Sequence, residues 1–269
     1  MEFSEVLSVA LDAARAATAI HQRHIGRVRL EDWSAKGNAD FVSFVDHEAE
    51  RCIIDRISAV FPAHEIMAEE SVSPDGGDRA WEEIEWLWLV DPLDGTTNFL
   101  HGYPSYCASI AVAHHGQLVA GAVVAGATCQ EWTAVAGGGA QLNGTPIVVS
   151  PIANFASALI GTGFPFKNME PLPGYLKQFA AIVARCSGVR RAGSAALDLC
   201  HVASGYFDGF WELDLNPWDI AAGVLLIREA GGLVTGFNGN PLDPFRHGPV
   251  VAGNPAIHAE LLNIVQGAE

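Results

Sequence analysis

Near the start of the chain, apolar side chains recur at the spacing of an amphipathic helix. Between residues 3 and 24 they fall three and four positions apart, while polar residues such as Asp12 and Arg15 occupy the opposite face. Residues 44–60 repeat the pattern. We therefore predict that two amphipathic helices open the chain.

The middle of the chain is almost free of charge. From Gly95 to Phe166 the only charged residue is Glu131, yet Gly, Pro, His, Asn and Gln interrupt the stretch too often for the roughly 20 unbroken apolar residues that a membrane helix needs. We predict a buried sheet with helices on both faces. Its expected strands are 64–68, 85–90, 105–113 and 118–125, with hairpin turns at 114–117 and 137–139.

In the second half, helical and strand-like patterns alternate. Helices are predicted at 172–186, 194–204, 217–230 and 255–266, and strands at 157–161, 207–213 and 249–252. This order indicates a layered α/β (α+β) architecture. Since no linker interrupts the chain, residues 1–269 are expected to form one compact unit with lobes of about 1–150 and 151–269. The cleft between the lobes is the expected site.

Charge and cysteine content narrow the classes of function. The 15 basic and 31 acidic residues leave a formal charge of −16, which disfavours direct binding to nucleic acid or to an anionic membrane. A phosphate ester would approach such a protein only where bound cations invert the local field. The five cysteines form no CxxC pair and the N-terminus resembles no secretion signal, so we expect neither a disulfide framework nor a cysteine zinc site, and a cytoplasmic location.

The clearest chemical signal follows the apolar segment 86–90. It leads into Asp91-Pro-Leu-Asp94-Gly-Thr-Thr, which places two carboxylates at the end of a buried strand, where α/β sites usually lie. Gly95 permits close backbone approach, and the following residues resemble a helix start whose amides can receive phosphate. The segment combines acid groups with amide donors.

Each of these features also has a purely structural interpretation. Asp91 and Asp94 suit an Asx turn and a helix cap, and Glu69-Glu70 suits a solvated loop. Asp219 would favour the dipole of a helix that has Asn216 as N-cap and Pro217 in its first turn. His21-x-x-His24 is expected on a helix surface, with no recognisable ligand spacing.

Taken together, acids on an apolar background indicate bound cations. Oxygen ligands without nearby His or Cys point to Mg²⁺, with Mn²⁺ as a possible substitute. Two-metal hydrolysis of a phosphoester follows as a hypothesis, in which the protein mainly positions groups and neutralises charge.

The order and spacing of several motifs resemble the inositol monophosphatase family over essentially the whole chain. The matching segments are 40–46, 69–71, 88–99 and 218–223, while 161–167 and 191–198 are most similar to its bacterial SuhB-like branch. This resemblance implies an αβαβα sandwich of the inositol monophosphatase and fructose-1,6-bisphosphatase type. It also implies a homodimer, activation by Mg²⁺ and inhibition by Li⁺.

The resemblance also implies roles for individual residues. Glu69, Asp91 and the Leu93 carbonyl would bind one metal, Asp91, Asp94 and Asp219 a second, and Glu69 would support a weaker third. Glu69 and Thr96, the latter backed by Asp46, would orient the attacking water, and Lys36 matches a lysine near the metals. The residues expected to contact phosphate and alcohol are Gly95, Thr96, Gly193, Ser194, Ala195 and Glu212.

The implied activity is Mg²⁺-dependent hydrolysis of a small phosphorylated metabolite, first of all myo-inositol 1-phosphate. Histidinol phosphate, fructose 1,6-bisphosphate and 3′-phosphoadenosine nucleotides are alternatives, because the alcohol pocket varies while the metal motif is shared. A SuhB-like role as a protein partner in transcription or ribosome assembly is an alternative of another class.

Overall fold

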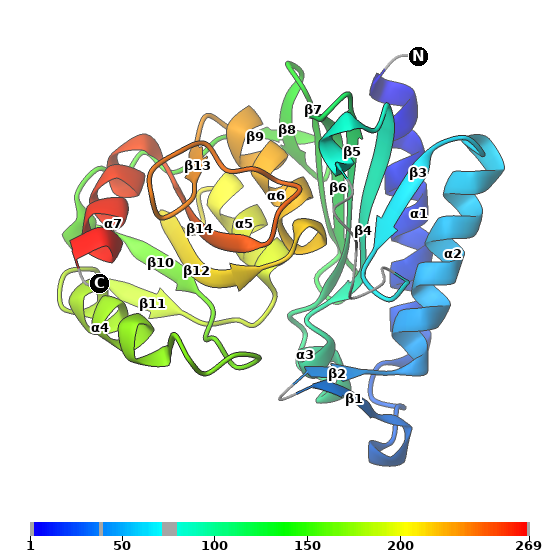
Figure 1. Ribbon diagram of the computed structural model, residues 1–269, viewed down its shortest axis with the longest axis horizontal. Coiled ribbons are helices and arrows are strands. Elements are labelled where there is room, and N and C mark those ends of the chain that lie inside the picture. The colour runs from blue at the N-terminus through cyan, green and yellow to red at the C-terminus, as the bar shows by residue number, and fades with distance from the viewer. Residues whose placement is uncertain (1–2, 38–39, 72–79, 268–269) are drawn as a thin grey trace.

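The computed structural model describes residues 3–37, 40–71 and 80–267, in which sheets and helical layers alternate (Figure 1). Its larger sheet has seven strands in the order β3-β4-β5-β6-β7-β8-β9. Only β3 and β4 pair in parallel, and the remaining neighbours are antiparallel. The strands are β3 (Glu65–Ala68), β4 (Trp86–Asp94), β5 (Cys107–His114), β6 (Gln117–Ala125), β7 (Gln130–Val135), β8 (Gly139–Leu142) and β9 (Thr145–Ile147).

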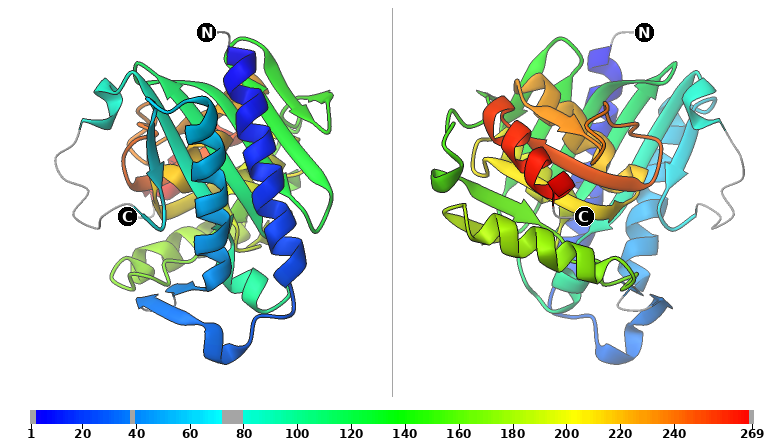
Figure 2. Two further views of the ribbon diagram at one scale, coloured as in Figure 1. Left: turned by 90° about the vertical axis from the view of Figure 1, so that its right-hand side faces the viewer. Right: turned by 60° about the vertical axis from the view of Figure 1, so that its left-hand side comes forward.

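Helices α1 (Phe3–His24) and α2 (Phe44–Val60) cover one face of this sheet (Figures 1 and 2). Their apolar stripes join a core cluster with the strand residues Trp88 and Ile110. The α2 helix begins with a capping box, in which the Ser43 side chain accepts from the helix and Asp46 accepts from the Ser43 amide. This cap places Asp46 at the buried start of the helix.

The opposite face packs on α5 (Ala195–Ala203) and α6 (Pro217–Glu229), which also contact the second sheet. That sheet has the order β11-β10-β12-β14-β13, and α4 (Leu172–Val183) and α7 (Pro255–Gly267) cover its outer face. Its strands are β10 (Leu159–Thr162), β11 (Gly188–Arg190), β12 (Gly209–Leu215), β13 (Leu233–Thr235) and β14 (Gly248–Gly253). The layers run αβαβα, as predicted.

The predicted longer helices and strands are confirmed, with ends that shift by a few residues. Several short elements were not predicted, because three or four residues show no usable periodicity. These are β1 (Ser34–Gly37), β2 (Asp40–Val42), β9, β11, β13 and the 3₁₀ turns Leu30–Asp32, Trp81–Glu83 and Phe155–Ser157. The helix start expected after Asp94 is present as α3 (Thr96–Leu100).

All five cysteines are free thiols, as expected. Among the described residues, no helix has the length and apolar character needed to span a bilayer. The sheet that is almost free of charge is therefore explained by its burial between helical layers.

Candidate active site

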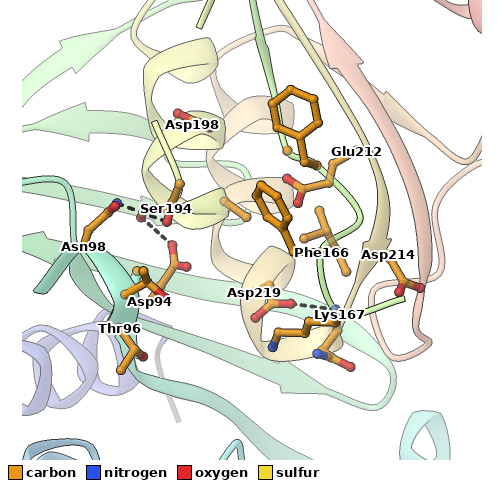
Figure 3. Close-up of a pocket in the computed structure, with 18 of the residues that line it drawn as sticks. Asp94, Thr96, Asn98, Phe166, Lys167, Ser194, Asp198, Glu212, Asp214 and Asp219 are labelled. Carbon is orange, nitrogen blue, oxygen red and sulfur yellow. Dashed lines mark hydrogen bonds between the residues drawn. The ribbon is translucent and has the colours of Figure 1, made fainter. Parts of the chain in front are cut away.

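A cavity of about 350 Å³ opens where the two sheets and α5 and α6 approach one another (Figure 3). Asp46 does not line the cavity but contacts Thr96, which does. Lys36 belongs to β1, and its side chain lies outside the part of the chain that the structure describes. The predicted site residues that line the cavity are Glu69, Asp91, Leu93, Asp94, Gly95, Thr96, Gly193, Ser194, Ala195, Glu212 and Asp219.

A β-bulge aims both carboxylates of the Asp91-Pro-Leu-Asp94 segment into this cavity. In a regular strand, residues three apart point to opposite faces of the sheet. Here β4 does not end at Val90 as predicted but continues to Asp94, and its pairing with β5 changes from Asp91 opposite Ser109 to Asp94 opposite Cys107. The extra residue on β4 allows both side chains to line the cavity.

Asp91 lies at the floor of the site and is 2% exposed. Its Oδ1 accepts from the Leu93 amide at 3.0 Å, so the Asx-turn interpretation is also correct. The turn is supported from behind by His21, whose Nε2 lies 2.9 Å from the Pro92 carbonyl oxygen. Burial lowers the pKa of His21 to about 4, so the neutral ring donates here. The expectation that His21 lies on a helix surface was wrong.

Asp94 caps a helix, but not the one that follows it in the sequence. Its Oδ2 accepts from the Ser194 hydroxyl at 2.5 Å and from the Ala196 amide at 2.8 Å, at the start of α5 (Figure 3). The N-cap of α3 is instead Gly95, with φ of 88° and room for no side chain, since a Cβ would come within 2.7 Å of the Ser105 carbonyl oxygen. Asp94 therefore joins the two halves of the site.

Glu69 is positioned by a residue that the sequence analysis did not identify. The Glu50 carboxylate accepts from the Glu70 amide at 2.7 Å and from the Ser71 hydroxyl at 2.6 Å, and it holds the turn that follows β3. Glu50 is only 6% exposed, one helical turn after Asp46 on the buried side of α2. Two acids four residues apart on an otherwise apolar helix face were the available signal.

Thr96 and Asp46 are in contact, as predicted. The Thr96 hydroxyl lies 3.0 Å from Asp46 Oδ1 and 3.0 Å from the Leu93 carbonyl oxygen. Asp46 Oδ2 accepts from both the amide and the hydroxyl of Ser43, each at 2.8 Å. The α2 cap thus holds Asp46, and Asp46 orients Thr96.

Without bound cations, burial and mutual repulsion disfavour the ionised form of the acids that line the cavity. Burial raises the pKa of Asp91 well above its usual value, and the charges of Glu69, Asp94 and Asp219 raise it further. The pKa values of Asp94 and Asp219 are also raised, chiefly by burial. Asp219 stays in place because its Oδ2 accepts from the Asn216 amide at 2.7 Å in the predicted cap of α6. Hard oxygen donors whose charges repel one another fit Mg²⁺.

Glu212 faces the other end of the cavity from β12 (Figure 3). Burial raises its pKa to about 8, against the opposing effect of the Arg191 charge. Its carboxylate occupies the space beside Gly163, where a Cβ would overlap it. Asp198 of α5 also lines the cavity, is 1% exposed and leaves Oδ1 without a hydrogen-bond partner. Gly163 and Asp198 were not predicted as site residues.

Asn98 ties α3 to the loop before α5. Its Nδ2 donates to the carbonyl oxygens of Ser105, at 2.7 Å, and Ala192, at 2.8 Å. A third contact, to the Gly193 carbonyl oxygen at 3.2 Å, holds Gly193 at the wall of the cavity that the acids line. Asn98 falls within the matching segment 88–99, but no role was predicted for it.

Comparisons with known proteins agree with this geometry. The sequence profile of the inositol monophosphatase family matches residues 2–269. The Nus factor SuhB of Pseudomonas aeruginosa is 42% identical over 97% of this chain and 96% of that protein. The inositol-1-monophosphatase of Mesorhizobium japonicum is 42% identical over 99% of this chain and 98% of that protein.

Solved structures with a similar fold also point to this family. The structure of the extragenic suppressor protein SuhB from Bartonella henselae has a TM-score of 0.90 at 39% identity, covering 97% of this chain and 98% of that one. The match over the full length, together with a cavity that gathers the motif acids, supports one assignment: this chain belongs to the inositol monophosphatase family and is a metal-dependent phosphatase.

Proposed function

We propose that the chain hydrolyses a small phosphomonoester, with myo-inositol 1-phosphate as the first candidate. The observation that carries this proposal is the cavity itself, which gathers acids from β4 and α6 at one end and Glu212 at the other. One end suits a phosphate held by cations, and the other suits a polar alcohol. Its volume of about 350 Å³ is in the range of small-molecule sites.

Glu69, Asp91 and the Leu93 carbonyl would hold one Mg²⁺ ion, and Asp91, Asp94 and Asp219 would hold a second, so Asp91 would belong to both ligand sets. A third ion would depend on Glu69. When bound, the ions supply Lewis acidity, which lowers the pKa of a water molecule and offsets negative charge on the phosphate and the leaving oxygen. The α5 cap holds one face of Asp94, so its other oxygen is available to the site.

Thr96 is the residue best placed to orient the attacking water. Because its single proton is donated to Asp46 or to the Leu93 carbonyl, its oxygen remains an acceptor for a water proton. Glu69 lines the same cavity and would accept the other proton of that water molecule in a hydrogen bond. Asp46 is a positioning residue, since it acts through Thr96.

Backbone amides and Glu212 would complete the substrate contacts. The Gly95 and Thr96 amides would bind phosphate, while Gly193, Ser194, Ala195 and Glu212 would face the alcohol. Burial raises the pKa of Glu212 to about 8, so its carboxyl group can hold a proton and donate as well as accept. A polyol can satisfy either form, because each hydroxyl both donates and accepts.

A panel of esters tests the choice of substrate. We expect kcat/KM with Mg²⁺ to be at least tenfold higher for myo-inositol 1-phosphate than for histidinol phosphate, fructose 1,6-bisphosphate or 3′-phosphoadenosine 5′-phosphate, which corresponds to about 1.4 kcal/mol in the transition state. A higher value for another ester would reject inositol phosphate as the substrate and leave the metal chemistry intact.

Gly163→Ala is expected to impair recognition of the alcohol. The added methyl would overlap the Glu212 carboxylate, which must then move. We expect KM for the preferred ester to rise about tenfold, the cost of one displaced polar contact, with little change for p-nitrophenyl phosphate. Gly174→Ala on α4 is the matched control, since a Cβ there meets nothing within 4 Å. Equal effects of both substitutions would contradict this role of Gly163.

The names of several relatives favour a second candidate function. Proteins of Pseudomonas aeruginosa and Vibrio cholerae at 42% and 41% identity are named Nus factor SuhB. A role of this chain as a protein partner in transcription predicts that an Asp94→Asn variant still co-purifies with the transcription machinery. Absence of that machinery from both the variant and the wild type would remove this candidate.

The homodimer that the family resemblance implies remains a prediction. Light scattering can measure the mass of the particle in solution.

A further inference from the structure

Far from the cavity, the start of β4 and the turn after β5 bring an acid and two histidines together. Ligand atoms of Glu85, His114 and His115 all lie within 4.8 Å of one another. Glu85 and His115 are exposed and His114 is half-buried. Glu85 precedes Asp91 by six residues of mostly extended chain, which places this cluster roughly 20 Å from the catalytic acids.

We propose that Glu85, His114 and His115 form a second metal site, which takes a late first-row divalent cation such as Zn²⁺. Two imidazoles and one carboxylate are a zinc-type donor set, with water completing the tetrahedron. The catalytic acids offer oxygen alone and suit Mg²⁺. Imidazole nitrogen prefers zinc, nickel or copper, so the two sites differ in the ion that they select.

The backbone around this second site is held by sheet pairing. Trp86 lies directly opposite His114 in the pairing of β4 with β5. The His115 amide donates to the Glu85 carbonyl oxygen at 2.9 Å, so the residues that carry two of the ligands are bonded to each other. His115, with φ of 48°, and Gly116, with φ of 71°, form the tight turn into β6. The ligands therefore lose little backbone freedom when an ion binds.

Aromatic stacking orients the His114 ring. Its centroid lies 4.1 Å from that of Trp86, and Trp86 also stacks on His64, with 5.0 Å between their ring centroids. The His64 Nδ1 accepts from the Trp88 indole at 3.0 Å. The stacked rings of His64, Trp86 and His114 are thereby connected to a buried side chain of β4. Stacking uses the faces of the His114 ring, whereas its nitrogens lie on the ring edge. A bound ion would thus link the start of β4 to the turn between β5 and β6.

Calorimetric titration with Zn²⁺ at pH 7.5, in millimolar Mg²⁺, tests the site. We expect the wild type to bind one more Zn²⁺ ion than His115→Asn and His114→Phe, or to bind that ion at least tenfold more tightly. Asn tolerates the positive φ of residue 115, and Phe keeps the stack on Trp86 while removing both nitrogens. Glu85→Gln keeps the side-chain size and should also weaken binding.

Two controls separate ion binding from misfolding. His47→Asn removes another exposed histidine, on α2, and should bind Zn²⁺ as the wild type does. Mg²⁺-dependent phosphatase activity should be unchanged in all these variants. Wild-type stoichiometry and affinity in His114→Phe and His115→Asn would overturn the proposal.

Nuclear magnetic resonance of the wild-type histidine side chains gives a test that needs no variant. The ring signals of His114 and His115 should shift when one equivalent of Zn²⁺ is added. Ring signals that stay in place at saturating Zn²⁺ would equally reject the site, whatever the behaviour of the variants.

Discussion

Asp94→Asn is expected to lower kcat at least 100-fold while the protein remains folded. The substitution removes a negative charge that the second Mg²⁺ ion would need, but the asparagine carbonyl can still accept from the Ser194 hydroxyl and the Ala196 amide. The α5 cap, which joins the two halves of the site, therefore survives. Loss of groups that merely support a metal ligand typically costs 10- to 100-fold in metal affinity or activity, so loss of a ligand charge should cost at least the upper value.

Steady-state kinetics at saturating Mg²⁺, together with thermal unfolding, provide the measurement for this variant. Asp214→Asn is the matched control, because Asp214 is an acid of the same cavity that pairs with His247 at 2.9 Å and is not a proposed metal ligand. We expect kcat of Asp214→Asn to fall less than tenfold. If Asp94→Asn retained kcat within a few-fold of the wild type, the assignment of Asp94 as a metal ligand would be wrong.

Removal of divalent cations is expected to abolish activity and to lower Tm, more so at pH 8 than at pH 5. Burial raises the pKa of Asp94 to about 6. Burial, together with the charges of Glu69 and Asp94, raises the pKa of Asp219 to about 8. Both values lie above those of the unfolded chain, so without cations the folded state binds protons more tightly. The stability that comes from this protonation is complete near pH 4 and is lost as the pH rises toward 8. Bound Mg²⁺ replaces the protons.

Thermal unfolding in EDTA and in Mg²⁺, recorded from pH 5 to pH 8, measures this effect. For a chain of this size, each kcal/mol changes Tm by about 2–4 °C. The gap between the two Tm values should therefore widen by roughly 5 °C or more across the range. A gap that is equal at both ends would show that the acidic cluster does not bind the cations, and activity that persists in EDTA would reject metal dependence at this site.

Much of the fold could be predicted because its elements carry their own periodicity. The helix at 44–60 appears within its predicted bounds because apolar spacing and the Ser43 cap are local properties. Short strands such as β13 exist only because a neighbouring strand offers hydrogen bonds, and no local pattern marks them. His21 was misplaced for the same reason, since its burial depends on the turn around Pro92 that it contacts.

The sequence by itself determined which acids are the candidates for the chemistry, namely those of the Asp91-Pro-Leu-Asp94 segment, Glu69 and Asp219, which all line one cavity. It also determined the amphipathic elements that hold them. Only the tertiary structure decided how they act together. The bulge in β4 turns Asp94 to the same side as Asp91, and Asp94 caps α5 rather than α3. Gly163 leaves the space that Glu212 fills. The physical reason is that periodicity and capping act over a few residues. The directions of the carboxylates depend instead on pairing and packing between separate segments of the chain, which lie 100 residues apart in the contact of Asp94 with Ser194. No local pattern records such contacts.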